Sequence, residues 1–218
     1  MTRPSEIPDP DELPEVPEAQ PFRPAYGIVA LAASAGGLNA LREVLSGLPT
    51  EFPIPVVAVQ HLDPRHRSLI AGILGRHSAL PVRQAADGDG LQSGAVYIAP
   101  PDRHLLVNSD GTLSLTQTEL VHFLRPSADL LFESVAASFK DRAIAVVLTG
   151  TGADGSMGVR AIKKMGGTVI AQDEGSSEFF GMPSAAIKSG HVDFVLPLKE
   201  ISRALVTLVM EGRDERNA

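Results

Sequence analysis

The chain has 218 residues, a net charge of −7, 44% hydrophobic residues and no cysteine. The absence of cysteine excludes a disulfide scaffold, a thiolate nucleophile, a zinc ribbon and an iron–sulfur site, and it fits a cytoplasmic protein. No apolar run approaches the roughly 20 residues of a membrane-spanning helix, and no cluster of basic residues is present, so we expect neither membrane insertion nor nucleic-acid binding.

Composition divides the chain into tails and a folded body. Residues 1–24 contain seven prolines, six acidic residues and two arginines, which is typical of a disordered tail. Such a tail serves either for docking and tethering or only as a solubilising segment. We predict one folded domain over residues 25–212 and a short polar C-terminal tail over residues 213–218.

From residue 26 onward, apolar runs alternate with amphipathic segments. In chain order the pattern predicts a strand at 26–32, a helix at 38–45, a strand at 54–59, a helix at 68–77, strands at 95–99, 104–107 and 113–116, a helix at 128–139, a strand at 143–148, a helix at 156–165, a strand at 168–172, a short helix at 183–189, a strand at 194–196 and a helix at 201–210. Ser127 is expected to cap the helix at 128–139, with Asp129 in its first turn.

These elements predict the fold class. Continuous apolar strands joined by helices are typical of a three-layer, doubly wound α/β domain whose sheet is mostly parallel. The turn sequence Asn108-Ser-Asp-Gly111 between two short strands is a hairpin signal. We therefore expect the region 90–118 to form an antiparallel hairpin insertion.

Three chemically useful side chains follow strands of this predicted sheet. Ser34 follows the first strand, His61 the second and Asp154 the strand at 143–148. In open parallel sheets, ligands bind at the carboxyl ends of the strands. A hydroxyl, an imidazole and a carboxylate at that edge are the parts of a nucleophile, a general base and an orienting acid.

Each of the three also has a simpler explanation. Ser34 and Asp154 stand where helix caps are common, and a lone histidine such as His61 is usually a surface or packed residue. Their coincidence at one edge of the sheet favours a catalytic site. The remaining histidines are less well placed by this pattern: His66, His77, His104, His122 and His191.

Two other motifs compete for the same segments. Gly150–Gly155 reads Gly-x-Gly-x-x-Gly between a strand and a helix, and Asp173 follows the next strand, as in dinucleotide-binding proteins. However, Asp154 would place a carboxylate where a pyrophosphate needs free amides. The nucleophile elbow of α/β-hydrolases is not matched, because Ala32 replaces its first glycine and the chain order is Ser, His, Asp.

Six short blocks make the sequence recognisable: ASAGGL at 33–38, VQHL at 59–62, VYIAPP at 96–101, RPS at 125–127 before Asp129, LTGTGADG at 148–155 and GMP at 181–183. In this order they resemble the catalytic domain of the bacterial chemotaxis protein-glutamate methylesterases. The resemblance implies that Ser34 is the nucleophile, His61 the base and Asp154 the orienting acid. It also implies a glutamyl methyl ester of chemoreceptor cytoplasmic helices as substrate, with glutamine deamidation as a related activity, and no metal or cofactor is expected.

The sequence departs from the family pattern at several points. Ala32 stands where the family usually has glycine. At position 151 the two-domain members commonly have methionine, whereas Thr151 is similar to the subgroup fused to methyltransferases. No receiver domain stands before residue 26 in this sequence, so we expect activity that is independent of a phosphodonor or controlled by a separate regulator protein. Two alternatives stay open: a catalytically weak docking module of a signalling complex and, less favoured, a nucleotide-binding oxidoreductase.

Overall fold

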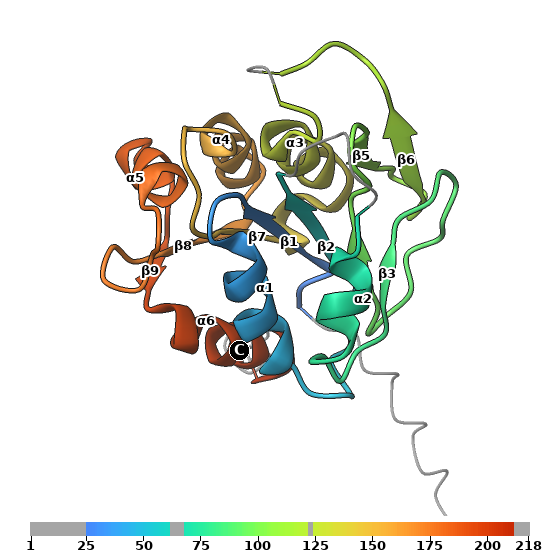
Figure 1. Ribbon diagram of the computed structural model, residues 1–218, viewed down its shortest axis with the longest axis horizontal. Helices are drawn as coiled ribbons and strands as arrows, with labels where there is room; N and C mark the ends of the chain where they lie inside the picture. Colours follow the sequence, from blue (N-terminus) through green and yellow to red (C-terminus); the bar gives the residue numbers. More distant parts are fainter. Residues whose placement is uncertain (1–24, 62–67, 122–123, 212–218) are drawn as a thin grey trace, which may run out of the picture.

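The computed structural model describes residues 25–61, 68–121 and 124–211, and the predicted tails at 1–24 and 213–218 lie outside these ranges. Seven strands form one parallel sheet in the order β3-β4-β2-β1-β7-β8-β9 (Figure 1). Their bounds are Ile28–Ala33 for β1, Val56–Gln60 for β2, Val82–Gln84 for β3, Val96–Ile98 for β4, Ala143–Val147 for β7, Thr168–Gln172 for β8 and Phe194–Leu196 for β9.

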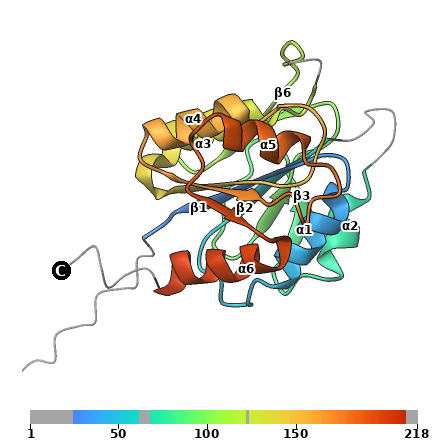
Figure 2. The same ribbon diagram turned by 90° about the vertical axis from the view of Figure 1, so that its left-hand side faces the viewer.

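Helices cover both faces of this sheet. The helices α1 (Gly37–Ser46), α2 (Ile70–Gly75) and α6 (Leu198–Val206) lie on one face; α3 (Ala128–Phe139), α4 (Ser156–Lys164) and α5 (Gly181–Lys188) lie on the other (Figures 1 and 2). Every residue of β1, β2 and β7 is buried, because the sheet has a hydrophobic layer on each face. The predicted three-layer α/β fold is therefore confirmed.

The order of the strands reverses at β1. The strands β2, β3 and β4, which come next in the chain, lie on one side of β1, and β7, β8 and β9 lie on the other. The helix after β1 and the helix after β7 consequently leave toward opposite faces (Figure 2). At such a reversal a crevice opens beyond the carboxyl ends of the two central strands, which is where ligands bind in this class of fold.

The antiparallel hairpin is smaller than expected and separate from the main sheet. The strands β5 (His104–Val107) and β6 (Leu113–Thr116) pair only with each other, and Gly111 turns the chain with a φ of 82°. The prediction of an insertion over 90–118 is wrong in its extent, because β4 pairs in parallel with both β2 and β3. Pattern alone could not assign so short a buried strand to one sheet or the other.

The strand β3 was not predicted at all. It has only three residues, and two of them, Arg83 and Gln84, are polar and exposed at the edge of the sheet. A strand of this kind has neither a buried run nor a measurable alternation. The closing segment also differs from expectation, since α6 begins at Leu198 and continues as a π-helical turn over Thr207–Glu211. Among the described residues, no helix is long and apolar enough to cross a membrane.

Candidate active site

The three predicted site residues lie on turns that follow neighbouring strands. Ser34 follows β1, His61 follows β2 and Asp154 lies in the turn between β7 and α4. The amide of His61 donates to the carbonyl of Ala33 at 3.1 Å, and the amide of Ser34 donates to the carbonyl of Thr149 at 3.0 Å. Backbone hydrogen bonds therefore continue past the strand ends and fix the turns against one another.

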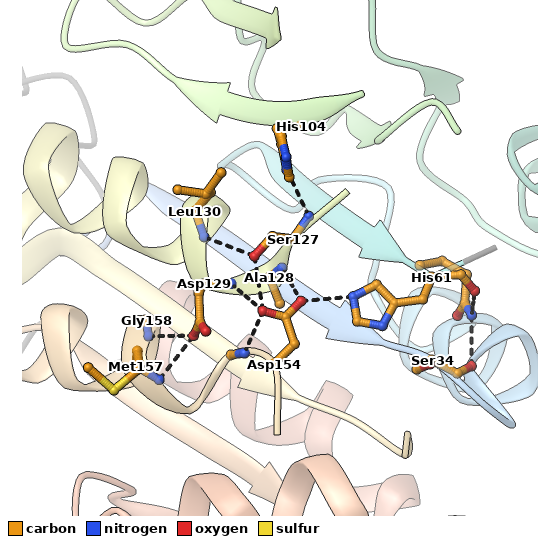
Figure 3. Close-up of polar contacts among 12 residues, drawn as sticks. Ser34, His61, His104, Ser127, Ala128, Asp129, Leu130, Asp154, Met157 and Gly158 are labelled. Carbon is orange, nitrogen blue, oxygen red and sulfur yellow. Dashed lines mark hydrogen bonds and ion pairs between the residues drawn. The ribbon is translucent and has the colours of Figure 1, made fainter. Parts of the chain in front are cut away.

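His61 and Asp154 form a direct pair. The Nε2 atom of His61 lies 2.9 Å from Oδ2 of Asp154. The imidazole is 9% exposed and the carboxylate is fully buried, so water does not screen the contact. In Figure 3 the ring of His61 lies between Asp154 and Ser34, and Nδ1 is the nitrogen that remains for other partners.

The carboxylate of Asp154 accepts several further hydrogen bonds. Oδ1 accepts from the hydroxyl of Ser127 at 3.0 Å and from the amides of Asp129 and Gly155 at 3.1 Å, and Oδ2 accepts from the amide of Ala128 at 2.6 Å (Figure 3). Burial raises the pKa of this carboxyl, but the hydrogen bonds from His61 and from the amides outweigh burial and leave the pKa below its usual value. Asp154 is therefore an ionised, immobile partner for the imidazole.

Neither Ser34 nor Asp154 is the N-cap residue of the helix that follows it. The N-cap of α1 is Gly36 and that of α4 is Gly155, and neither helix has a capping bond from a side chain of its own N-cap residue. The hydrogen bonds described for Ser34 are made by its backbone, and a bond from its hydroxyl to the imidazole is not among them. By contrast, Ser127 caps α3 as predicted, since its side chain accepts from the amide of Leu130.

Gln60 joins the turns of Ser34 and His61, a role that no sequence pattern indicates. It is 5% exposed, and its Nε2 atom donates to the carbonyl of Ser34 at 2.7 Å and to the carbonyl of His61 at 3.0 Å. A Cβ at residue 37 would lie 2.1 Å from the Oε1 atom of Gln60 and 2.7 Å from Cβ of Ala33, so space favours glycine at position 37. A single carboxamide thus links the backbones of two predicted site residues.

The start of α5 and the residue segment before it are hydrogen-bonded to the turn that follows β7. The amide of Gly150 donates to the carbonyl of Phe179 at 2.9 Å, and the amide of Met182 donates to the carbonyl of Gly150 at 2.8 Å. A Cβ at Gly150 would lie 2.8 Å from Cβ of Ser34 and would also meet the sulfur of Met182. Glycine is therefore needed where the turn after β7 passes the serine.

The backbone amides that a dinucleotide phosphate would need already have acceptors within the protein. The amides of Gly155, Met157 and Gly158 donate to carboxylates, so the start of α4 does not offer them to a phosphate. Asp173 accepts from the amide and the hydroxyl of Ser176 and so closes its own loop. Within the described residues, no group of three or more His, Cys, Asp or Glu side chains could hold a metal ion.

Comparison with known proteins identifies the family of the chain. The model of the CheB methylesterase family matches residues 29–205. The chain belongs to the CheB methylesterase family. A relative from Leptospira interrogans is 38% identical over 191 residues, which cover 88% of this chain and 99% of the relative. The protein-glutamate methylesterase/protein-glutamine glutaminase 2 of Anaeromyxobacter dehalogenans is 45% identical over 194 residues, which are 88% of this chain but 57% of that protein.

A solved structure of the CheB family supports the fold as well. The crystal structure of the Thermotoga maritima CheB methylesterase catalytic domain matches with a TM-score of 0.81 and 38% identity, covering 84% of this chain and 99% of that one. The family and the enzyme class expected from the sequence, a carboxylic ester hydrolase, are thereby confirmed.

Proposed function

We propose that this CheB-family chain removes the methyl ester from glutamyl side chains on the cytoplasmic helices of methylated chemoreceptors. In this proposal Ser34 is the nucleophile, His61 the general base and Asp154 the orienting acid. The observation that carries it is the buried bond between His61 and Asp154 at the point where the strand order reverses. The names of the relatives support the substrate class.

In the proposed mechanism each nitrogen of the imidazole has its own task. Because Nε2 of His61 is bound to Asp154, Nδ1 is the atom that takes the proton of the Ser34 hydroxyl. As this proton leaves, Oγ of Ser34 bonds to the ester carbonyl carbon. The tetrahedral intermediate then breaks its bond to the methoxy oxygen, and the proton on Nδ1 passes to that oxygen, so that methanol departs. Water attacks the acyl-serine by the same route and releases the glutamate.

An oxyanion forms in both halves of the reaction and needs amide donors. The amides of Ser34 and Gly37 already donate to the carbonyls of Thr149 and Ser34. We assign the amide of Ala35 to the oxyanion, with Thr151 on the facing turn as the second donor. One such donor is worth roughly 3–4 kcal/mol of transition-state stabilisation.

The experiment is methanol release from a methylated chemoreceptor cytoplasmic fragment. We expect turnover by the purified full chain and a loss of roughly 10⁴-fold or more in Ser34→Ala, because a triad acts as a unit. Ammonia release from a glutamine-containing fragment measures deamidation in the same samples. Circular dichroism and the melting temperature of the variant show that the loss is not unfolding.

Each alternative predicts a different result. A docking module would bind the receptor fragment with no methanol release by either protein. A nucleotide-binding oxidoreductase would change the fluorescence of NADPH on titration. Turnover by Ser34→Ala at a near-normal rate would move the nucleophile elsewhere and end the assignment.

A further inference from the structure

A second buried carboxylate lies behind the pair of His61 and Asp154. Asp129 is in the first turn of α3 and is 4% exposed, compared with 3% for Asp154. A buried carboxylate is costly unless its charge or its hydrogen bonds are used. The reaction steps proposed above use Asp154 and leave Asp129 without a task.

Asp129 and Asp154 each accept hydrogen bonds from the start of the other's helix. Asp154, just before α4, accepts from the amides of Ala128 and Asp129 at the start of α3. In return, Oδ1 of Asp129 accepts from the amides of Met157 at 3.0 Å and Gly158 at 2.8 Å, at the start of α4. These are amides that a helix cannot satisfy by itself, and Figure 3 shows the two carboxylates side by side between the helices.

The position of Asp154 depends on how α4 is held. Gly155, the N-cap of α4, has no side chain to bind the first turn, so Asp129 supplies the acceptor from outside the helix. The two helices also touch closely, because a Cβ at Gly158 would lie 2.6 Å from Cβ of Phe132 and 3.0 Å from the carbonyl oxygen of Asp129. A shift of α4 would therefore carry the carboxylate of Asp154 away from the imidazole.

The two carboxyl groups differ in how readily they take up a proton. Burial, together with the charge of Asp154, raises the pKa of Asp129. Burial acts in the same direction on Asp154, but its hydrogen bonds outweigh burial and lower its pKa. As pH falls, Asp129 therefore takes up a proton before Asp154, and Asp154 remains the charged partner of His61.

We infer that Asp129 is a positioning residue for ester hydrolysis: by binding the first turn of α4 it fixes the carboxylate of Asp154 against His61. Its kinetic readout rests on the proposed function, whereas the hydrogen bond between His61 and Asp154 can be observed without any substrate.

Two substitutions at Asp129 separate its hydrogen bonds from its charge. Asp129→Asn keeps an oxygen that can accept from Met157 and Gly158, and it resembles the protonated carboxyl. Asp129→Ala removes the acceptor. We expect Asp129→Asn to stay within about 3-fold of the native kcat, and Asp129→Ala to lose kcat by about 100-fold with KM nearly unchanged, because a small misplacement of a catalytic group has a cost of this size.

A spectroscopic readout tests the position directly. In protein labelled with ¹⁵N-histidine, the Nε2 proton of His61 bound to Asp154 gives a downfield NMR signal that is assigned by its loss in His61→Gln. We expect this signal in the native chain and in Asp129→Asn. In Asp129→Ala it should be lost or broadened at a temperature where the protein is still folded.

Asp193→Ala is the matched control. Asp193 also accepts a backbone amide, that of Val169, and pairs with Lys163, but it lies at the amino ends of the strands, opposite the site. We expect this variant to lose stability and to keep both kcat and the His61 signal. Loss of the signal and of kcat in Asp193→Ala would show that general destabilisation is enough, and would overturn the inference.

The remaining outcomes separate the two proposals. If Asp129→Ala keeps the native kcat and the His61 signal, Asp129 is not a positioning residue, while the proposed esterase function stands. If the native chain releases no methanol but the His61 signal still depends on the acceptor at residue 129, the positioning of Asp154 is supported and the proposed function fails.

Discussion

At the scale of single residues, the site depends on which hydrogen bond each group already has. The carboxylate of Asp154 is bound on both oxygens, and Nε2 of His61 is committed to it. This leaves Nδ1 to exchange protons. The arrangement favours one tautomer of the imidazole, and in the proposed mechanism the neutral imidazole in that tautomer is the base.

Asp154→Asn tests this reading of the imidazole. The amide group of asparagine can donate to Nε2 of His61, which favours the tautomer whose proton is on Nδ1. In that tautomer Nδ1 cannot accept the proton of the Ser34 hydroxyl. We expect kcat for methanol release to fall by about 10⁴-fold. The measurement is a single-turnover assay with ¹⁵N NMR of the imidazole. An unchanged tautomer together with a rate near the native one would contradict the prediction.

Gln60→Leu tests the link between the two turns. Leucine fills a similar space but cannot donate to the carbonyls of Ser34 and His61, so the turns lose their shared restraint. We expect kcat to fall by about 10- to 100-fold and the free energy of unfolding by about 1–3 kcal/mol. Gln84→Leu on the exposed edge strand β3 is the control and should change neither quantity. Equal activity of the two variants would show that Gln60 only fills space.

At the scale of elements, α3 and α4 pack closely beside the site. Gly158 faces Phe132 and the backbone of α3 with no room for a methyl group. The two helices also exchange carboxylate acceptors through Asp129 and Asp154. Close packing and hydrogen bonds therefore both restrain the junction of α3 and α4, next to Asp154, the proposed orienting acid.

Two glycine substitutions compare crowding with helix propensity. Alanine is the better helix former, so Gly72→Ala in α2, where no atom lies within 4 Å of the new Cβ, should raise the free energy of unfolding by up to about 1 kcal/mol. Gly158→Ala should lower it by about 1–3 kcal/mol, because the methyl group overpacks the helix contact. Urea denaturation measures both. Stabilisation by Gly158→Ala would show that α4 can move away from α3.

At the scale of the whole molecule, the hairpin outside the main sheet is connected to the site. His104 in β5 is fully buried, and its Nδ1 atom accepts from the amide of Ser127 at 3.2 Å, while Nε2 lies 3.1 Å from the carbonyl of Glu119. The hydroxyl of Ser127 in turn donates to Asp154. Burial lowers the pKa of His104, and an imidazole that accepts an amide hydrogen bond must be neutral.

His104 should therefore make stability depend on pH. Because its pKa in the folded state is lower than in the unfolded chain, the unfolded chain binds more protons below about pH 6.5, so this contribution is complete above that value and is lost as pH falls. We expect the free energy of unfolding to decrease from pH 7 to pH 5.5, and to decrease less in His104→Asn, which keeps an acceptor for Ser127 but does not titrate. Both proteins keep all the other histidines, so the difference between the two curves reports on His104. Parallel curves for the two proteins would contradict this assignment.

The sequence alone determined the class of fold and predicted where in that fold the site lies. Long apolar strands such as 143–148 and amphipathic helices between them can form little else than a covered parallel sheet, and the carboxyl ends of its strands lie at one edge. This was sufficient to choose Ser34, His61 and Asp154 together. It was not sufficient for β3 or for the pairing of β4, because three-residue strands have too few residues for a periodic pattern.

The tertiary structure decided which groups contact one another. Gln60, His104 and Asp129 looked like a strand end, an unassigned histidine and a first-turn acid, because their partners are 23 to 29 residues away in the chain or on another turn. Hydrogen bonds of this kind depend on distances in space that no local pattern records. The sequence therefore determined where chemistry could occur, and the packing of α3 against α4 decided how Asp154 is held, since only the folded chain brings the starts of these two helices together.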